Sequence, residues 1–190
     1  MTLIDAQASN NRDLGGASFS LRNRITRICW KLCWTLLGKW TPPPLHRWRC
    51  ILLRLFGAKV GRGVRIYGST IIWLPSNLAI GDSVIIGPRA NLYNQGVIEI
   101  GNRAVISQGA HLCASSHDVN DYYFQLVLRP IRVAPNAWIA AEAFVGPGVT
   151  IGEGAVLGAR AVAMRNLEPW GIYSGNPAKY LKQRVFQQLP

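Results

Sequence analysis

The sequence is poor in acidic residues and in histidine, and its few cysteines follow no regular spacing. It has 9 Asp and Glu against 21 Lys and Arg, which gives a formal net charge of +12. This excess attracts polyanions such as nucleic acid, anionic lipid headgroups or phosphorylated small molecules. The four cysteines fit neither a zinc-finger spacing nor a disulfide framework. They are Cys29, Cys33, Cys50 and Cys113.

Long hydrophobic runs are also missing. No stretch reaches the roughly 20 apolar residues that a membrane-spanning helix needs. Lys31 interrupts the run from Ile28 to Leu37, and the first residues lack the basic region of a signal peptide. We therefore expect a cytoplasmic protein, with peripheral contact on the inner face of the membrane as an open alternative.

The positive charge is concentrated near the N-terminus. Residues 1–59 hold ten basic and two acidic residues, and no acidic residue occurs from Leu14 to Gly81. We expect a flexible tail over 1–19 and a basic amphipathic helical segment over 20–58. Three successive prolines separate its two helices, predicted over 20–40 and 45–56. These helices either cap the domain that follows or bind an anionic membrane surface.

From Val60 onward, aliphatic residues recur every six positions. The cleanest run is Val133, Ile139, Val145, Ile151, Leu157 and Ala163. A glycine or alanine follows each of the first five. Neither an α-helix nor a plain strand uses a period of six. Hexapeptide periods are typical of parallel β-helices, whose coils are stable only when stacked on neighbours.

The register predicts where each coil begins. If three hexads form one coil of a three-sided prism, the coils start at residues 60, 80, 100, 133 and 151. The predicted fold class is therefore all-β: a left-handed parallel β-helix over 59–166 with a loop insertion at 114–132. We expect a turn and a helix in 167–190. That helix, over 178–188, would cover the unpaired backbone at the end of the prism.

The loop insertion carries the candidate chemistry. Loops on a rigid scaffold often hold functional residues, and this one contains Ser115-Ser116-His117-Asp118. His117 would leave the coil at its edge with the imidazole facing outward, which suits a general base near neutral pH. Asp118, Asp121 and Glu142 are all candidates for the carboxylate that orients it.

These features resemble the hexapeptide-repeat O-acetyltransferases. The resemblance covers roughly residues 40–187 and rests on the hexads, the His117 loop, the run Ala137-Trp138-Ile139-Ala140-Ala141 and Gly175-Asn176-Pro177-Ala178. The nearest branch is that of the colanic-acid biosynthesis acetyltransferases, beside the maltose, galactoside and nodulation enzymes. It implies a homotrimer with active sites between neighbouring prisms, acetyl-CoA as co-substrate and no metal requirement. The implied acceptor is a sugar, an exopolysaccharide precursor or a glycolipid precursor.

The resemblance also implies residue roles. The loop histidine, here His117, deprotonates the acceptor hydroxyl, and the backbone N–H of Ala141 stabilises the oxyanion. Trp138, Ala140, Gly158 and Ala159 would line the pantetheine channel. Arg165, Lys179 and Lys182 would lie near the phosphates of coenzyme A. Gly87 stands where related enzymes have an asparagine, and we assign acceptor binding to Asn94.

Other functions remain open at this stage. Cys113 lies four residues before His117 and is a candidate covalent nucleophile. A metal-dependent β-helix would need three imidazoles around zinc, and the chain has only His46, His111 and His117. A non-catalytic β-helix or a basic surface-binding module is the alternative from a different class. No helix-turn-helix or RNA-binding signature accompanies the charge, so no nucleic-acid partner is expected.

Overall fold

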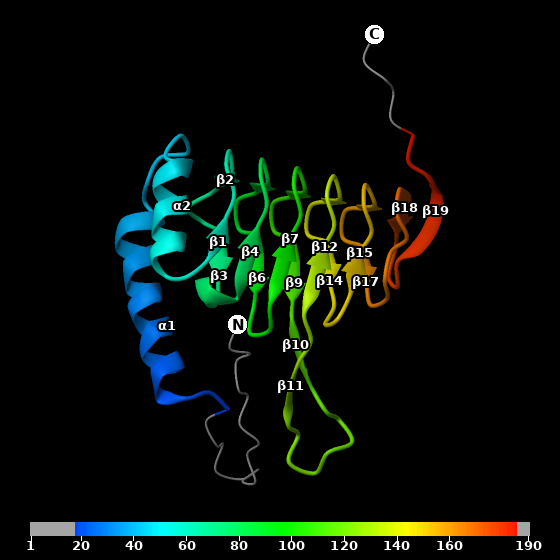
Figure 1. The fold of residues 1–190 in the computed structure, drawn as a ribbon. Coiled ribbons are helices and arrows are strands. Elements are labelled where there is room, and N and C mark those ends of the chain that lie inside the picture. The colour runs from blue at the N-terminus through cyan, green and yellow to red at the C-terminus, as the bar shows by residue number, and fades with distance from the viewer. Residues whose placement is uncertain (1–17, 186–190) are drawn as a thin grey trace.

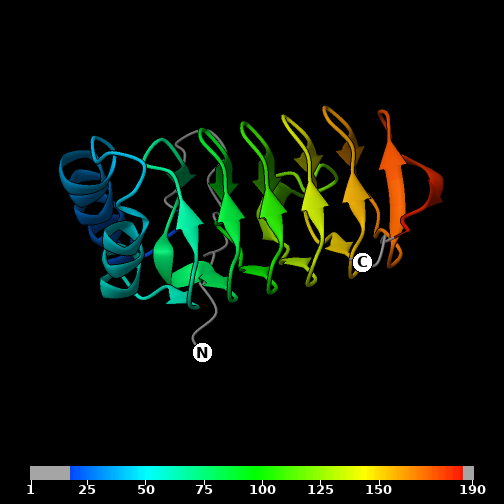
Figure 2. The same cartoon turned by 90° about the horizontal axis from the view of Figure 1, so that it is seen from above.

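The chain forms a stack of triangular coils with helices at one end (Figures 1 and 2). The structure is a computed structural model and describes residues 18–185. Nearly all of the expected tail, residues 1–19, lies outside the described residues. The parallel β-helix predicted from the hexads is confirmed.

Each of the first five coils contributes one strand to each of three faces, and neighbouring strands within a face run parallel. The first face consists of β1 (Lys59–Val60), β4 (Leu78–Ile80), β7 (Ile98–Ile100), β12 (Ile131–Val133) and β15 (Thr150–Ile151). The second contains β2 (Arg65–Ile66), β5 (Ile85–Ile86), β8 (Val105–Ile106), β13 (Trp138–Ile139), β16 (Val156–Leu157) and β18 (Gly171–Ser174). The third contains β3 (Ile71–Ile72), β6 (Asn91–Tyr93), β9 (His111–Cys113), β14 (Phe144–Val145) and β17 (Val162–Ala163).

The predicted coil starts are confirmed by the strand register. Val60, Ile80, Ile100, Val133 and Ile151 are successive partners along the first face. The two shifts of the hexad pattern fall in the first two coils, where the chain takes extra residues at a corner. One of these extra segments is the short 3₁₀ helix η2 (Pro75–Asn77).

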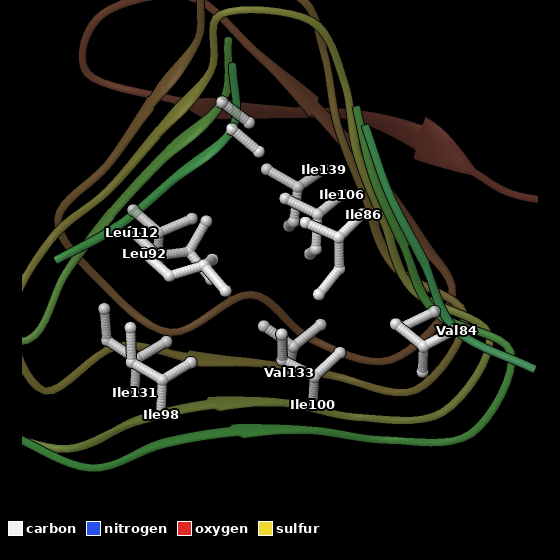
Figure 3. Close-up of a cluster of buried hydrophobic side chains, with 14 of the residues drawn as sticks. Val84, Ile86, Leu92, Ile98, Ile100, Ile106, Leu112, Ile131, Val133 and Ile139 are labelled. Carbon is white, nitrogen blue, oxygen red and sulfur yellow. The ribbon is translucent and has the colours of Figure 1, made fainter. Parts of the chain in front are cut away.

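The core is a set of aliphatic columns along the inside of the prism. Ile86, Ile106 and Ile139 are fully buried and lie above one another on neighbouring coils (Figure 3). Glycine is required where coils approach closely: a Cβ at Gly81 would lie 2.8 Å from the backbone nitrogen of Asn102 on the next coil. This explains the small residue that follows the aliphatic position.

The N-terminal helices cap the first coil. They are α1 (Leu21–Cys33), the π-helical turn η1 (Trp34–Gly38) and α2 (His46–Leu55). The indole N–H groups of Trp30 and Trp34 donate to the carbonyls of Ile72 (2.9 Å) and Thr70 (3.1 Å) on the third face. Arg49, which is fully buried, donates to the Ile66 carbonyl on the second face. These side chains satisfy carbonyl groups that have no preceding coil to bind.

The loop insertion is a β-hairpin that projects from the prism (Figure 1). Its strands are β10 (Ser115–His117) and β11 (Leu126–Leu128), which pair antiparallel. It leaves the prism after β9, at the corner between the third face and the first face of the next coil. We call this the third corner, and the corner between the second and third faces the second corner.

The predicted C-terminal helix is wrong. After β18, a turn at Gly175 reverses the chain, and β19 (Lys179–Gln183) pairs antiparallel with β18. A strand pairs both its N–H and its C=O groups with the open edge of the second face, which a helix cannot do. Residues 186–188 of the predicted helix lie outside the described part of the chain.

Candidate active site

His117 ends β10 and is exposed on the hairpin, as the sequence suggested. Its Nδ1 lies 2.7 Å from the carbonyl oxygen of Phe124, and the two rings stack with centroids 4.5 Å apart. A carbonyl only accepts hydrogen bonds, so Nδ1 carries the proton and Nε2 is left with a free lone pair. In this tautomer of the neutral imidazole, Nε2 can accept a proton.

The three candidate carboxylates have other partners than this imidazole. Asp118 accepts a hydrogen bond from the Asn120 N–H, and Asp121 accepts one from the Tyr123 N–H. Glu142 pairs with Arg160 at 2.6 Å. Within the described chain, the backbone carbonyl of Phe124 is the group that orients His117.

Ala141 lies at the second corner, in the turn between β13 and β14. Its carbonyl accepts a hydrogen bond from the Arg160 N–H of the next coil, at 2.9 Å. Among residues 18–185, the Ala141 N–H donates no backbone hydrogen bond. This N–H is therefore free to bind an anionic oxygen. Ala159 occupies the equivalent position one coil further and is exposed.

Most of the other residues implied for coenzyme A lie along the second face and second corner. Trp138 is 44% exposed on β13, and its indole N–H donates to the Ser107 hydroxyl at 2.9 Å. It lines a shallow hollow of about 410 Å³ with Arg103, Asn136 and Arg184 among its neighbours.

The corner continues towards the basic C-terminal strand. Ala140 is buried, and the Gly158 N–H donates to the Tyr173 carbonyl at 2.8 Å. Tyr173 lies on β18, which places the second corner next to β19. Lys179 and Lys182 are exposed on β19, opposite Ser174 and Ile172. They therefore form a basic end to the second face.

The candidate residues fall into two groups that one chain does not bring together. Trp138, Ala141, Ala159 and the β19 lysines belong to the second face and its corner. His117 belongs to the third corner, and so does Arg165, which is exposed after β17. The two groups lie at different corners of the triangle, so His117 and Ala141 are apart within a single prism.

Asn94 lies at the third corner, but its side chain is used by the fold. It is fully buried, its Oδ1 accepts from the N–H groups of Trp73 and Leu74, and its Nδ2 donates to the Leu74 carbonyl. These contacts fix the extra corner residues of two coils. Because the side chain is also fully buried, an acceptor cannot reach it, so we assign Asn94 a structural role.

The rival chemistries gain no geometric support. The Cys113 thiol is half-buried and donates to the Ser115 carbonyl at 3.3 Å. His46 lies in the helical cap, where its Nδ1 contacts the Ile66 carbonyl at 2.8 Å. In the described part of the chain, no group of three or more His, Cys, Asp or Glu side chains is arranged to hold a metal ion.

Sequence reasoning missed Phe124, which holds His117 through both its carbonyl and its ring. The available signal was the strand-turn-strand pattern of the insertion, which places residues on both sides of its turn opposite one another. It also missed Ser107, the partner of the Trp138 indole. Phe124 acts across the turn of the hairpin, and Ser107 acts from the preceding coil.

No family model matches the chain. It is 41% identical over 178 residues to WcaF of Escherichia coli (strain K12), named as a colanic acid biosynthesis acetyltransferase. The match covers 92% of this chain and 98% of WcaF. Among solved structures, the acetyl-coenzyme A complex of the hexapeptide-repeat acetyltransferase VCA0836 from Vibrio cholerae has a TM-score of 0.79 at 19% identity. It covers 88% of this chain and 91% of that one.

A galactoside acetyltransferase in complex with coenzyme A also has a TM-score of 0.79, at 21% identity, covering 86% of this chain and 83% of that one. The fold is thus the one that hexapeptide-repeat acetyltransferases use. At the sequence level, the chain belongs to the acetyltransferase family of WcaF. It is an acyltransferase. Among residues 18–185, no helix has the length and apolar character needed to cross a membrane.

Proposed function

We propose that the protein transfers the acetyl group of acetyl-CoA to a hydroxyl of a sugar, or of an exopolysaccharide or glycolipid precursor. His117 acts as the general base. The observation that carries this proposal is the His117 imidazole, exposed on the hairpin with Nδ1 held by the Phe124 carbonyl. The match to WcaF along nearly its whole length supports the acceptor class. We place the reaction in the cytoplasm.

The chemistry is a direct transfer. Nε2 of His117 takes the proton of the acceptor hydroxyl as its oxygen attacks the thioester carbonyl. Negative charge develops on the carbonyl oxygen, and the free N–H of Ala141 stabilises it. The carbon–sulfur bond then breaks, and the coenzyme A thiolate recovers a proton from His117. The products are the acetyl ester and free coenzyme A.

The second corner supplies the cofactor site in this proposal. Trp138, Ala140, Gly158 and Ala159 form the wall along which an extended pantetheine arm lies. Lys179 and Lys182 meet the phosphates, together with Arg165 of the neighbouring chain, whose third corner faces this one. Since His117 lies at another corner of its own prism, the site needs a second chain whose third corner faces this second corner. Three chains arranged in this way close into a homotrimer.

The role of His117 is tested by His117→Ala. Loss of a general base typically lowers the rate by about 10²–10⁴-fold. We expect the variant to bind acetyl-CoA as the wild type does and to release thiol that much more slowly. The acceptor substrate for this assay is identified beforehand, by screening nucleotide sugars and lipid-linked saccharides for a mass gain of one acetyl group. Asp118→Asn is the matched control and should keep wild-type turnover; normal turnover in His117→Ala would reject the base.

The role of the Ala141 N–H is tested by Ala141→Pro, which removes only that donor. Pro135 and Pro88 occupy the same position in their own turns, each directly before a residue with positive φ, as Ala141 is before Glu142. The corner therefore accommodates proline. We expect a loss of about 10²–10³-fold in turnover with an unchanged melting temperature. Glu153→Pro, at a corner outside the proposed site, is the control; equal activity of the two variants would remove Ala141 from the mechanism.

A further inference from the structure

The outward side of the helical cap is apolar and exposed. Exposed fractions reach 72% at Leu36, 77% at Trp40 and 74% at Leu55. We define the outer face as the exposed large apolar residues of the cap: Leu21, Ile25, Ile28, Leu32, Leu36, Leu37, Trp40, Leu45, Trp48, Ile51 and Leu55. Single exposed apolar residues are normal, whereas a gathered set marks an interaction site.

The outer face is not needed to hold the helices on the prism. Ile25, Ile28 and Leu32 follow one another at three or four residues, so they share one side of α1. The buried Trp30 lies on the opposite side and binds the first coil. In α2, the buried Arg49 makes the same kind of contact. Because both helices lay their inner sides on the coil, both outer sides point away from the prism at one end (Figure 2).

Positive charge surrounds these apolar side chains. The exposed basic residues of the cap include Arg22, Arg24, Lys31, Lys39 and Arg47. No acidic residue from Leu14 to Gly81 offsets them. A helix with an apolar stripe and basic flanks is typical of segments that lie in a membrane interface. Tryptophan, here Trp40 and Trp48, is enriched at the same depth.

The positive charge also distinguishes an anionic bilayer from other possible partners of the outer face. A two-fold contact with a second copy would bring two sets of cations against each other, which opposes association. A nucleic-acid backbone would satisfy the cations but leave the apolar stripe in water. An anionic bilayer binds both: its phosphates meet the Arg and Lys side chains, and the boundary with its acyl chains accepts the apolar ones.

We propose that the outer face docks the molecule on the surface of an anionic lipid bilayer, with α1 and α2 lying in the interface. Neither helix crosses it. The inference does not rest on the proposed function, since it uses neither His117 nor the second corner.

Flotation of the full-length protein with vesicles tests the inference. The probes are vesicles of phosphatidylcholine alone and vesicles with about a third of phosphatidylglycerol. Ile28→Ser with Leu32→Ser removes apolar contacts, and Arg24→Glu with Lys31→Glu reverses charge. All four positions are exposed. The matched controls are Val119→Ser with Met164→Ser and Arg62→Glu with Arg89→Glu, which are exposed positions outside the cap.

We expect wild type and both controls to float with the anionic vesicles, and each cap variant to bind at least about tenfold more weakly. Raising the salt concentration should weaken wild-type binding, because the charges are exposed. The inference is overturned if wild type fails to float, or if the cap variants float as it does. If wild type does not float and the cap variants have a different oligomeric mass from wild type, the inference is also overturned. The outer face would then be a contact between copies of the chain. Circular dichroism checks that each variant is folded.

Discussion

His111 lies half-buried on β9, between the rings of Tyr93 and Phe144, whose centroids are 6.4 and 5.3 Å from its own. Its Nε2 is buried and has no hydrogen-bond partner in the described chain. Burial lowers the pKa of His111 below its ordinary value, because the charged imidazolium is poorly solvated there. The folded protein therefore binds this proton less readily than the unfolded chain does.

This lowered pKa makes the folded protein less stable at acidic pH. Stability from the neutral imidazole is fully present above the unfolded pKa of about 6.5 and is lost as the pH falls below it. We expect the wild-type melting temperature to drop more between about pH 7.5 and about pH 5.5 than that of His111→Phe, which cannot be protonated. An equal drop in both proteins would show that His111 contributes nothing to the pH dependence.

At the level of single residues, sequence reasoning was reliable where the position in the hexad determines whether a side chain points into the prism. The aliphatic position of the hexad predicted the buried Ile139 and Leu157. It was weaker where a partner comes from the backbone of another segment. Phe124 holds His117 with its backbone carbonyl. Every residue has this group, so the residue type does not identify the partner. Asn94 has the right chemistry for a ligand, yet its hydrogen bonds to Leu74 and Trp73 depend on corners whose shape the sequence does not reveal.

At the level of elements, the hairpin is separable from the prism. The coils on either side of it contact each other directly, through the pairs β7–β12, β8–β13 and β9–β14. The Arg129 N–H also bonds the Ala114 carbonyl across the base of the insertion, at 3.0 Å. The hairpin therefore adds a projecting arm without interrupting the stack.

Replacing residues 116–127 by Asn-Gly tests this separation. Ser115 and Leu128 are paired, and a two-residue turn joins paired strands with little strain. We expect unchanged circular dichroism and a melting temperature within about 5 °C of wild type, since stability resides in the stack. Acetyl transfer should fall at least as far as in His117→Ala. Unfolding of the shortened chain would show instead that the hairpin supports the coils.

The two ends of the prism show why some elements were harder to predict than others. The helix over Leu21–Cys33 was predicted because apolar residues recur there with a helical period. The prolines after Thr41 mark the end of this helical segment. The segment Lys179–Gln183 is short and rich in long side chains that suit a helix equally well. Its state is decided by the open edge of β18, a long-range contact that overrides local preference.

At the level of the whole molecule, the separation of the two corners has a consequence for catalysis. His117 projects from the third corner and Ala141 lies at the second, so under the proposed mechanism each chain holds two half-sites rather than one complete site. In the proposed trimer, the base of one chain serves the oxyanion donor of the next. Light scattering should then give three times the 21.0 kDa chain mass.

Mixed trimers of two inactive variants distinguish a shared site from a site within one chain. His117→Ala retains Ala141, and Ala141→Pro retains His117, so an interface between the two in the right order has both groups intact. With equal expression and random assembly, about a quarter of all interfaces have this composition, and we expect about a quarter of wild-type activity from the co-expressed mixture. Separately purified variants that are mixed without exchange of chains should stay inactive, which is the control. A site within one chain predicts no recovery in either mixture, because every chain then lacks the base or the donor.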